Sequence, residues 1–196
     1  MSSQNIARSK TVVSMAQAIK IIMNCYKSEK EQQVRMVPIM WGAPGQGKTA
    51  IIDQAVARLN AQRDILRAEV MASGMTEAMA LLKYPRVRVQ AFRLSQCDPT
   101  DLKGVPLYEE VNGKELTSFA APKAIPIVGI PDSADGYEVW LFLDEVAQAT
   151  PTMQNLASNI IDGKVGDHLI DMSRCFICAA ANRAEDFAAT FQMPKN

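Results

Sequence analysis

The sequence has few of the residues that mark secreted, fibrous or membrane-spanning proteins. Only four of its 196 residues are cysteine, which is sparse for this length, so we expect reduced thiols rather than disulfides. The longest apolar runs, such as residues 139–143, are far shorter than the ~20 residues that span a bilayer. Residues 2–5 are polar and lack the apolar core of a secretory signal. The sequence therefore predicts a cytoplasmic protein that does not act on membranes.

An excess of charge of one sign is also lacking. Lys and Arg together number 21, and so do Asp and Glu, so nothing marks the whole surface as a polyanion binder. Nucleic acid then remains a partner only through a local patch. The apolar fraction of 48% with 21% charged residues is typical of a globular domain and excludes disordered and collagen-like chains.

Apolar periodicity and turn residues predict interleaved helices and strands. The expected helices cover residues 11–26, 48–61, 71–82 and 152–161, and the expected strands cover 34–41, 86–95, 139–143 and 174–181. Ser9 or Thr11 is the expected cap of the first helix. Pro38 indicates an irregular or edge strand, and Asn112-Gly113 predicts a β-hairpin with a type I′ turn.

This order of elements favours an α/β fold in three layers, with a mainly parallel sheet and β-hairpin insertions. We expect residues 1–33 to form an N-terminal helical segment packed on a core of residues 34–196.

The strongest chemical signal is a complete G-x-x-x-x-G-K-[ST] pattern between an expected strand and an expected helix. The residues expected to contact a nucleotide are Gly42, Ala43, Pro44, Gly45, Gln46, Gly47, Lys48, Thr49 and Ala50. Glycines let successive backbone N–H groups face the phosphates, and the helix start adds its positive end. Lys48 would reach the β- and γ-phosphates, while the Thr49 hydroxyl would coordinate Mg²⁺. These residues predict binding of ATP with Mg²⁺.

Two carboxylates follow the most apolar of the expected strands. Asp144 and Glu145 end the run of residues 139–143, which matches the Walker B pattern. Because ligands of a parallel sheet bind beyond the carboxyl ends of its strands, Asp144 would lie beside the phosphate loop and hold Mg²⁺. Glu145 would orient or deprotonate the attacking water, so the pair favours hydrolysis over binding alone.

A third polar strand end comes at Asn182 and Arg183. Asn182 would donate a hydrogen bond to the γ-phosphate or hold the lytic water. For Arg183, a subunit contact, a salt bridge and a solvated surface charge all remain open. The candidate catalytic residues are thus Lys48, Glu145 and Asn182.

With these motifs in this order, residues 34–196 resemble the AAA+ ATPases, and in detail the MoxR group. The resemblance rests on residues 41–49, 98–106, 143–145 and 151–161 and on Ala181-Asn182. It implies Walker A roles for Lys48 and Thr49, Walker B roles for Asp144 and Glu145, and a sensor 1 role for Asn182. It also places Gln96 near the polar residue that restrains the Walker B glutamate in some relatives.

The resemblance further implies a homo-oligomeric ring, commonly hexameric, that remodels or activates a protein partner, often one with a von Willebrand-type domain. AAA+ cores are normally followed by a helical lid with sensor 2, and the arginine finger usually follows sensor 1. Since the sequence ends at Asn196, we expect a core without that lid, either as a fragment or with a partner that supplies these parts. A missing finger would limit the activity of the chain alone.

Two other functions are alternatives. An AAA+ motor or loader on nucleic acid would bind DNA in a salt-dependent way and be stimulated by it. A nucleotide-dependent assembly module with little turnover would bind ATP without hydrolysis, and Glu145→Gln would not affect this behaviour.

Overall fold

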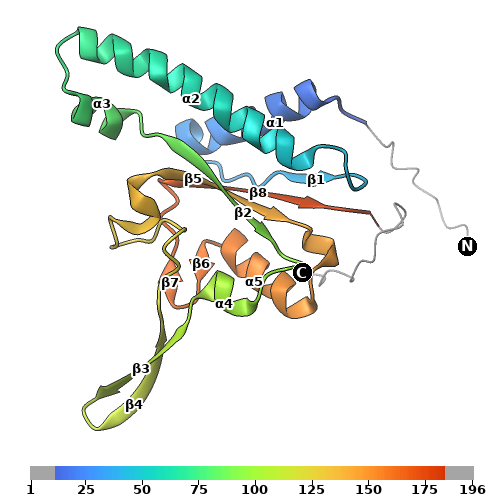
Figure 1. The fold of residues 1–196 in the computed structure, drawn as a ribbon, viewed down its shortest axis with the longest axis vertical. Helices are drawn as coiled ribbons and strands as arrows, with labels where there is room; N and C mark the ends of the chain where they lie inside the picture. Colours follow the sequence, from blue (N-terminus) through green and yellow to red (C-terminus); the bar gives the residue numbers. More distant parts are fainter. Residues whose placement is uncertain (1–11, 184–196) are drawn as a thin grey trace, which may run out of the picture.

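The computed structural model describes residues 12–183, which form an α/β fold around a four-stranded parallel sheet (Figure 1). The strands lie in the order β1-β8-β5-β2. Their bounds are Ile39–Trp41 for β1, Val87–Arg93 for β2, Glu138–Asp144 for β5 and Cys175–Ala181 for β8. The α/β class and the parallel sheet predicted from the sequence are confirmed. Since all four strands are parallel, their carboxyl ends share one edge of the sheet.

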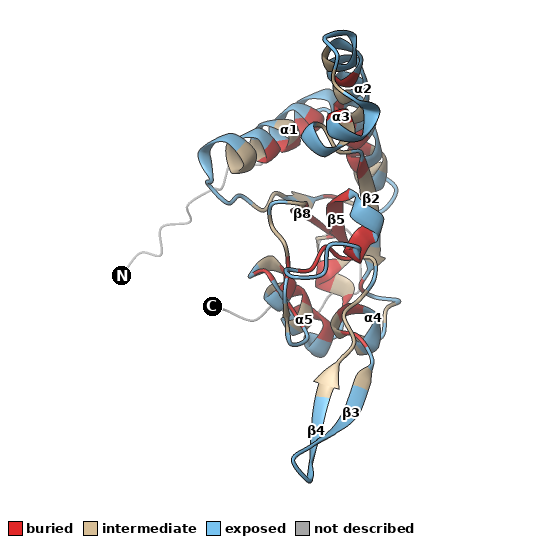
Figure 2. Cartoon of the chain, turned by 90° about the vertical axis from the view of Figure 1, so that its left-hand side faces the viewer, coloured by how far each residue is buried: buried red, intermediate tan, exposed pale blue. Residues whose placement is uncertain are grey.

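Helices cover both faces of this sheet. The helices α1 (Met15–Gln32) and α2 (Lys48–Ala72) lie on one face, and α4 (Pro99–Lys103) and α5 (Pro151–Ile161) lie on the other (Figures 1 and 2). Side chains of a strand alternate between faces, so Trp140 and Phe142 pack in the cluster under α1 and α2, while Leu141 and Leu143 pack in the cluster over α5.

The helices differ from the sequence prediction mainly in length. The helix α1 starts at Met15, where Ser14 is the cap and accepts a hydrogen bond from the Gln17 N–H; the caps expected at Ser9 and Thr11 lie outside the described residues. It also continues beyond residue 26, where the expected helix ends, to Gln32. The helix α2 is longer than expected and ends at Ala72. A separate helix, α3 (Glu77–Lys83), follows Gly74, whose φ of +99° a continuous helix does not allow.

The first strand is shorter and less buried than the sequence predicts. The expected buried strand of residues 34–41 reduces to β1, and Ile39 and Trp41 are 45% and 44% exposed. Within the described part of the chain β1 pairs only with β8, so it is an edge strand, as Pro38 indicates. The burial expected from the apolar run was wrong, because burial depends on a strand's neighbours, which an apolar run does not reveal.

A β-hairpin projects from the α5 side of the sheet (Figure 2). It consists of β3 (Pro106–Val111) and β4 (Lys114–Phe119), which pair antiparallel. Asn112 and Gly113 join them with φ of 56° and 72°, the values of a type I′ turn. The hairpin predicted from Asn112-Gly113 is therefore confirmed. A second, short hairpin of β6 (Lys164–Val165) and β7 (His168–Leu169) lies beside its base, and the sequence did not predict it.

A buried charge network ties α1 and α2 to the amino-terminal end of β5. The Glu138 carboxylate is almost fully buried and accepts hydrogen bonds from the Tyr26 hydroxyl at 2.8 Å and from Arg63 at 2.7 Å. Arg63 also donates to the Tyr26 oxygen at 2.6 Å, and Lys30 Nζ lies 3.4 Å from the carboxylate. Because a buried charge is costly without partners, these three donors hold the two helices in register with the sheet.

The cysteines lie apart from one another, and all four are free thiols. Cys175 belongs to the cluster over α5 and Cys178 to the cluster under α1 and α2, as expected for residues three apart in a strand. Burial raises the pKa of Cys175 to about 12 and also raises that of Cys178. Both are therefore structural thiols. Within residues 12–183, the helices are too short or too polar to cross a bilayer.

Candidate functional site

The glycine-rich loop joins β1 to α2 at the carboxyl edge of the sheet. Its first N–H, from Gly42, donates to the Ala181 carbonyl at 3.2 Å, which fixes the loop to the end of β8. Gly45 and Gly47 have φ of +77° and +75°, a region that other residues rarely adopt. The loop therefore turns sharply into the first turn of α2, where backbone N–H groups without helical partners favour an anion.

Lys48 and Asn182 meet at the carboxyl ends of β1 and β8. Lys48 Nζ donates to Asn182 Oδ1 at 2.6 Å and to the carbonyls of Gly42 and Ala43 at 2.9 and 3.0 Å. Asn182 is buried, so its position is fixed by packing as well as by this bond. Two residues that the sequence analysis selected independently are thus brought into contact, and a cation lies in the mouth of the glycine loop.

Asp144 faces the same side of the sheet as Lys48. It follows Phe142 by two positions, and Phe142 packs under α1 and α2, so alternation points the Asp144 side chain toward that face. Its Oδ1 accepts a hydrogen bond from the Glu145 N–H at 2.9 Å. Thr49 lies in the first turn of α2 on the same face. The two predicted metal ligands therefore lie at the same edge and on the same face of the sheet, with β8 between the strands that lead to them.

Glu145 departs from the strand and turns toward β2. Its φ of 58° and ψ of 36° are left-handed, an uncommon conformation for a residue with a side chain and one that clusters at functional sites. The Ser95 hydroxyl donates to its Oε2, and Arg93 Nε lies 3.7 Å from its Oε1. The carboxylate is thus held by two residues at the end of β2.

Sequence reasoning placed Gln96 near the residue that holds this glutamate and did not name Ser95. Gln96 accepts a hydrogen bond from Arg93 at 3.5 Å, and its neighbour Ser95 makes the contact with Glu145. The register of the sheet explains the contact, because Arg93 pairs with Asp144 and Leu94 N donates to the Asp144 carbonyl at 3.0 Å. A signal was available, since polar residues follow both expected strands, but the pairing of β2 with β5 was needed to use it.

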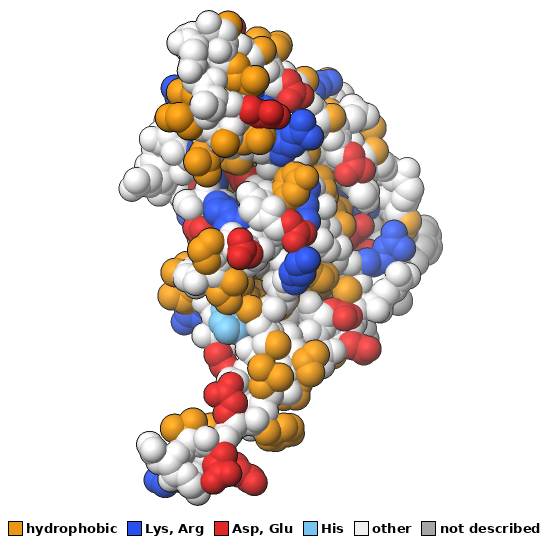
Figure 3. All heavy atoms as spheres, turned by 60° about the vertical axis from the view of Figure 1, so that its left-hand side comes forward, with side chains coloured by type: hydrophobic (Ala, Val, Ile, Leu, Met, Phe, Trp, Pro, Cys, Tyr) orange, Lys and Arg blue, Asp and Glu red, His pale blue; other side chains and the backbone are white. Residues whose placement is uncertain are grey.

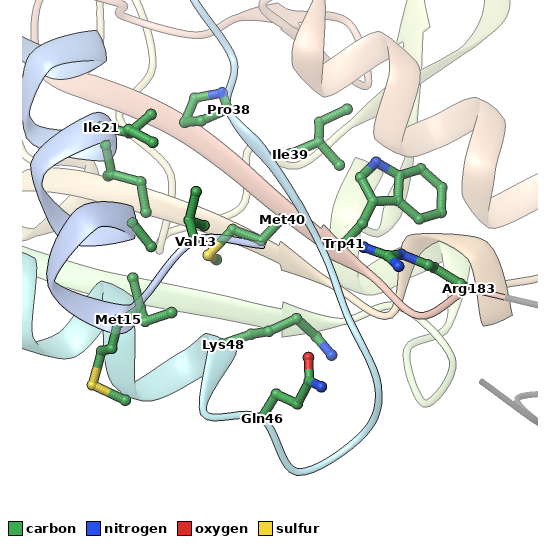
Figure 4. A pocket seen from close by; sticks show the side chains of 13 residues that line it. Val13, Met15, Ile21, Pro38, Ile39, Met40, Trp41, Gln46, Lys48 and Arg183 are labelled. Carbon is green, nitrogen blue, oxygen red and sulfur yellow. The ribbon is translucent and has the colours of Figure 1, made fainter. Parts of the chain in front are cut away.

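A cavity of about 400 Å³ opens beside Lys48 (Figure 4). Its wall is mostly apolar, from the start of α1 and from β1, and the polar side chains are those of Gln46, Lys48 and Arg183. In Figure 4 the amino group of Lys48 and the amide of Gln46 lie near each other, and the Arg183 side chain lies beside Trp41. The cavity thus pairs an apolar region with a cationic end at the glycine loop.

Residues 12–183 contain no cluster of three or more His, Cys, Asp or Glu side chains that could hold a metal on its own. Zinc-type centres are made of such clusters. Mg²⁺ differs, because it keeps several waters and is commonly held by one or two carboxylates together with substrate phosphates. The donor set of Thr49 and Asp144 fits that second kind of site.

A scan of the chain against models of protein families found no match, and a search of curated proteins found none either.

Proposed function

We propose that this protein binds ATP with Mg²⁺ at residues 42–50 and hydrolyses it, as a P-loop ATPase of the AAA+ class similar to the MoxR group. One observation carries the proposal: the lysine of a complete phosphate-loop motif contacts Asn182 at 2.6 Å, at the sheet edge where Asp144 also lies. Chance would rarely bring a glycine loop, an acidic strand end and a buried amide to one edge, where α/β sheets bind ligands.

The nucleotide's phosphates would lie over the loop, and Lys48 would exchange its carbonyl partners for phosphate oxygens. Such charge-assisted bonds are stronger than those to neutral carbonyls. Thr49 and Asp144 would hold Mg²⁺, which, when bound, neutralises charge on the phosphates. Asn182, with Oδ1 toward Lys48, would present its Nδ2 to the γ-phosphate or to the water that attacks it.

Glu145 would act as the general base or as the group that orients this water. For that it must leave the Ser95 hydroxyl and Arg93, which hold the carboxylate in this structure. The bond to Ser95 therefore restrains turnover, and nucleotide binding would release it.

The cavity beside Lys48 is suited to the base and sugar of the nucleotide. Its apolar wall from α1 and β1 offers packing area to a flat base. Its polar end lies at the glycine loop, where the phosphates would be (Figure 4). This polarity supports a nucleotide over inorganic phosphate as the ligand.

The finer assignment rests on the resemblance of residues 34–196 to the MoxR group. By that resemblance the protein is cytoplasmic and forms a homo-oligomer, commonly a hexameric ring, that remodels or activates a protein partner, such as one with a von Willebrand-type domain. Sensor 2 and the arginine finger would come from outside the described residues or from a neighbouring subunit.

The first experiment measures ATP turnover per chain against protein concentration, with Glu145→Gln and Lys48→Ala as controls. We expect Lys48→Ala to lose nucleotide binding and Glu145→Gln to bind ATP without hydrolysing it. Specific activity that rises with concentration would support sites completed by a neighbouring subunit. Unchanged ATP binding in Lys48→Ala would refute the phosphate-loop assignment.

One observation favours a second candidate, an assembly module that binds ATP with little turnover. Two side chains hold Glu145, and hydrolysis is slow when the general base is restrained. ATP binding without hydrolysis, at every protein concentration and equally in the wild type and Glu145→Gln, would select this candidate.

A further inference from the structure

The hairpin of β3 and β4 is a two-stranded sheet that extends into solvent beyond the rest of the fold (Figures 2 and 3). Its strands are exposed from Leu107 to Thr117. A two-stranded hairpin alone is at best marginally stable in water, and a third strand or a packed face is what usually stabilises it. In the described part of the chain, β3 and β4 pair only with each other, so each leaves one edge of backbone N–H and C=O groups unpaired.

The base of the hairpin is fixed firmly. Gly104 has φ of +87°, and a Cβ there would lie 1.8 Å from the Ala120 carbonyl oxygen, so the two ends of the hairpin touch. His168 Nε2 lies 2.7 Å from the Phe119 carbonyl oxygen, and the Phe119 N–H donates to Asp167 at 3.2 Å. A fixed base presents the exposed strands in one direction, which lowers the entropic cost of binding a partner.

The two faces of the hairpin carry different chemistry. Directly paired residues share a face, so Glu110 and Glu115 lie opposite each other on one face. Tyr108, 80% exposed, lies on that face too. Like charges directly opposite are destabilising in a sheet, and no cationic residue of β3 or β4 lies on this face. We call it the glutamate face.

The other face of the hairpin holds three apolar and three polar residues. It carries Leu107, Val111 and Leu116, all substantially exposed. Its charged residues are Glu109, which accepts a bond from Ser118 at 3.2 Å, and Lys114 at the turn. Exposed apolar residues gathered on one small element indicate a contact surface.

We propose that a strand of alternating cationic and apolar residues from a protein partner adds to the free edge of β3. Such a strand would place Lys or Arg beside Tyr108 and Glu110 on the glutamate face, and its apolar residues beside Leu107 and Val111 on the other. The edge of β3 matches this pattern better than that of β4, because β3 places two apolar residues, Leu107 and Val111, on this face beside Glu109, whereas β4 places only Leu116 there. A third strand also supplies the stabilisation that the hairpin lacks. This partner surface rests on the proposed function for its use, since it would recognise the protein on which the ATPase acts.

The probe is a fluorescent ten-residue peptide of alternating Lys and Val, titrated with the full 196-residue chain and followed by fluorescence anisotropy. The control peptide has the same composition as a block of five Lys followed by five Val. Both carry the same charge, but only the first can present Lys on one face and Val on the other. We expect the alternating peptide to bind about tenfold more tightly than the block peptide, the ratio for about 1.4 kcal/mol.

The matched variants change charge in two places. Glu110→Gln with Glu115→Gln removes two charges from the glutamate face, and we expect about a tenfold rise in Kd for the alternating peptide. Glu31→Gln with Glu69→Gln removes two charges from exposed positions of α1 and α2, and we expect less than a twofold change. Thermal unfolding checks the fold, and the first pair should be no less stable, because it removes a repulsion.

Equal affinity for the two peptides, or an equal loss in the two pairs of variants, would overturn the proposal. So would no binding, since the glutamates would then only keep the edge from pairing. Self-association that the glutamate-face variants abolish would make a second copy the occupant and overturn it too. ATP binding is measured on the same samples: lost peptide binding with intact ATP binding refutes this inference alone, and the converse refutes the proposed function alone.

Discussion

Replacing Asn182 by Asp tests whether Lys48 meets phosphate at the carboxyl edge. The change keeps the size of the side chain and places a negative charge 2.6 Å from Lys48 Nζ. A phosphate oxygen on the far side of that ammonium group would lie roughly 5.5 Å from the new charge, given hydrogen bonds of about 2.8 Å. At an effective dielectric constant of about 20, unit charges at that distance repel by about 3 kcal/mol. We therefore expect the Kd for ATP to rise about 100-fold.

The assay is isothermal titration with ATP and Mg²⁺, and two variants serve as controls. Asn182→Ala removes the amide without adding charge and should raise Kd by less than about tenfold, because it deletes one hydrogen bond. Asn159→Asp adds the same charge at an exposed position of α5, on the opposite face of the sheet, and should leave Kd within about twofold. If Asn182→Asp binds ATP as tightly as the wild type, the phosphates do not lie beside Lys48 and the site is wrongly placed.

The remaining predictions concern stability and turnover. Tyr26→Phe removes two buried hydrogen bonds and should lower the free energy of unfolding by about 2–3 kcal/mol, while the exposed Tyr108→Phe should change it by less than about 0.5 kcal/mol; equal values in urea titrations would contradict this. Burial raises the pKa of Tyr26 and Cys175, so above pH ~8.5–10 the unfolded chain releases protons that the folded one keeps, and stability falls as pH rises. Tyr26→Phe should reduce that slope above pH ~10 by about 1.4 kcal/mol per pH unit, and identical slopes would refute it. Ser95→Ala removes one of the two contacts that hold Glu145 and should raise the rate of hydrolysis about two- to tenfold; a slower variant would mean that Ser95 positions Glu145 productively.

Much of the site could be predicted from the sequence because its signals are local. The glycine loop requires φ values that glycine alone adopts readily, so Gly45 and Gly47 stand at positions with positive φ. The apolar run before Asp144 needs burial on both faces, and β5 is buried on both. The type I′ turn depends on Asn112 and Gly113 alone. None of these features requires knowledge of which strands are neighbours.

The features that sequence reasoning missed depend on such neighbours. Ser95 contacts Glu145 because β2 pairs with β5, across 50 positions of sequence. The exposure of Trp41 follows from the place of β1 at the edge. The network of Tyr26 and Glu138 joins residues 112 positions apart. Periodicity describes the face of one element, and it carries no information on the partner of that face.

The end of helix α2 shows a different limit. The apolar positions that predict a helix stop near Leu59, but α2 continues to Ala72 with Ile65 and Leu66 exposed. The added turns contain many good helix formers, such as Ala, Arg and Leu, and their inward contacts are made by charged side chains, since Arg63 binds Glu138 and Arg67 is buried. A rule based on apolar spacing cannot detect a helix whose inward side chains are charged.

The contacts of Glu145 and the hairpin belong to one continuous segment. Ser95 holds Glu145 at one end, and nine residues later Gly104 touches Ala120 at the base of the hairpin. Between them Leu102 of α4 is fully buried in the cluster over α5, so the segment is anchored to the core rather than free to absorb a shift. If nucleotide releases Glu145 from Ser95, the change therefore acts on a segment that ends at the proposed partner surface. Coupling between two binding sites is reciprocal. ATP should therefore change the affinity for the alternating peptide by the same factor by which the peptide changes the affinity for ATP. Ser95→Ala removes the contact that links the two sites, so in this variant neither ligand should change the affinity for the other.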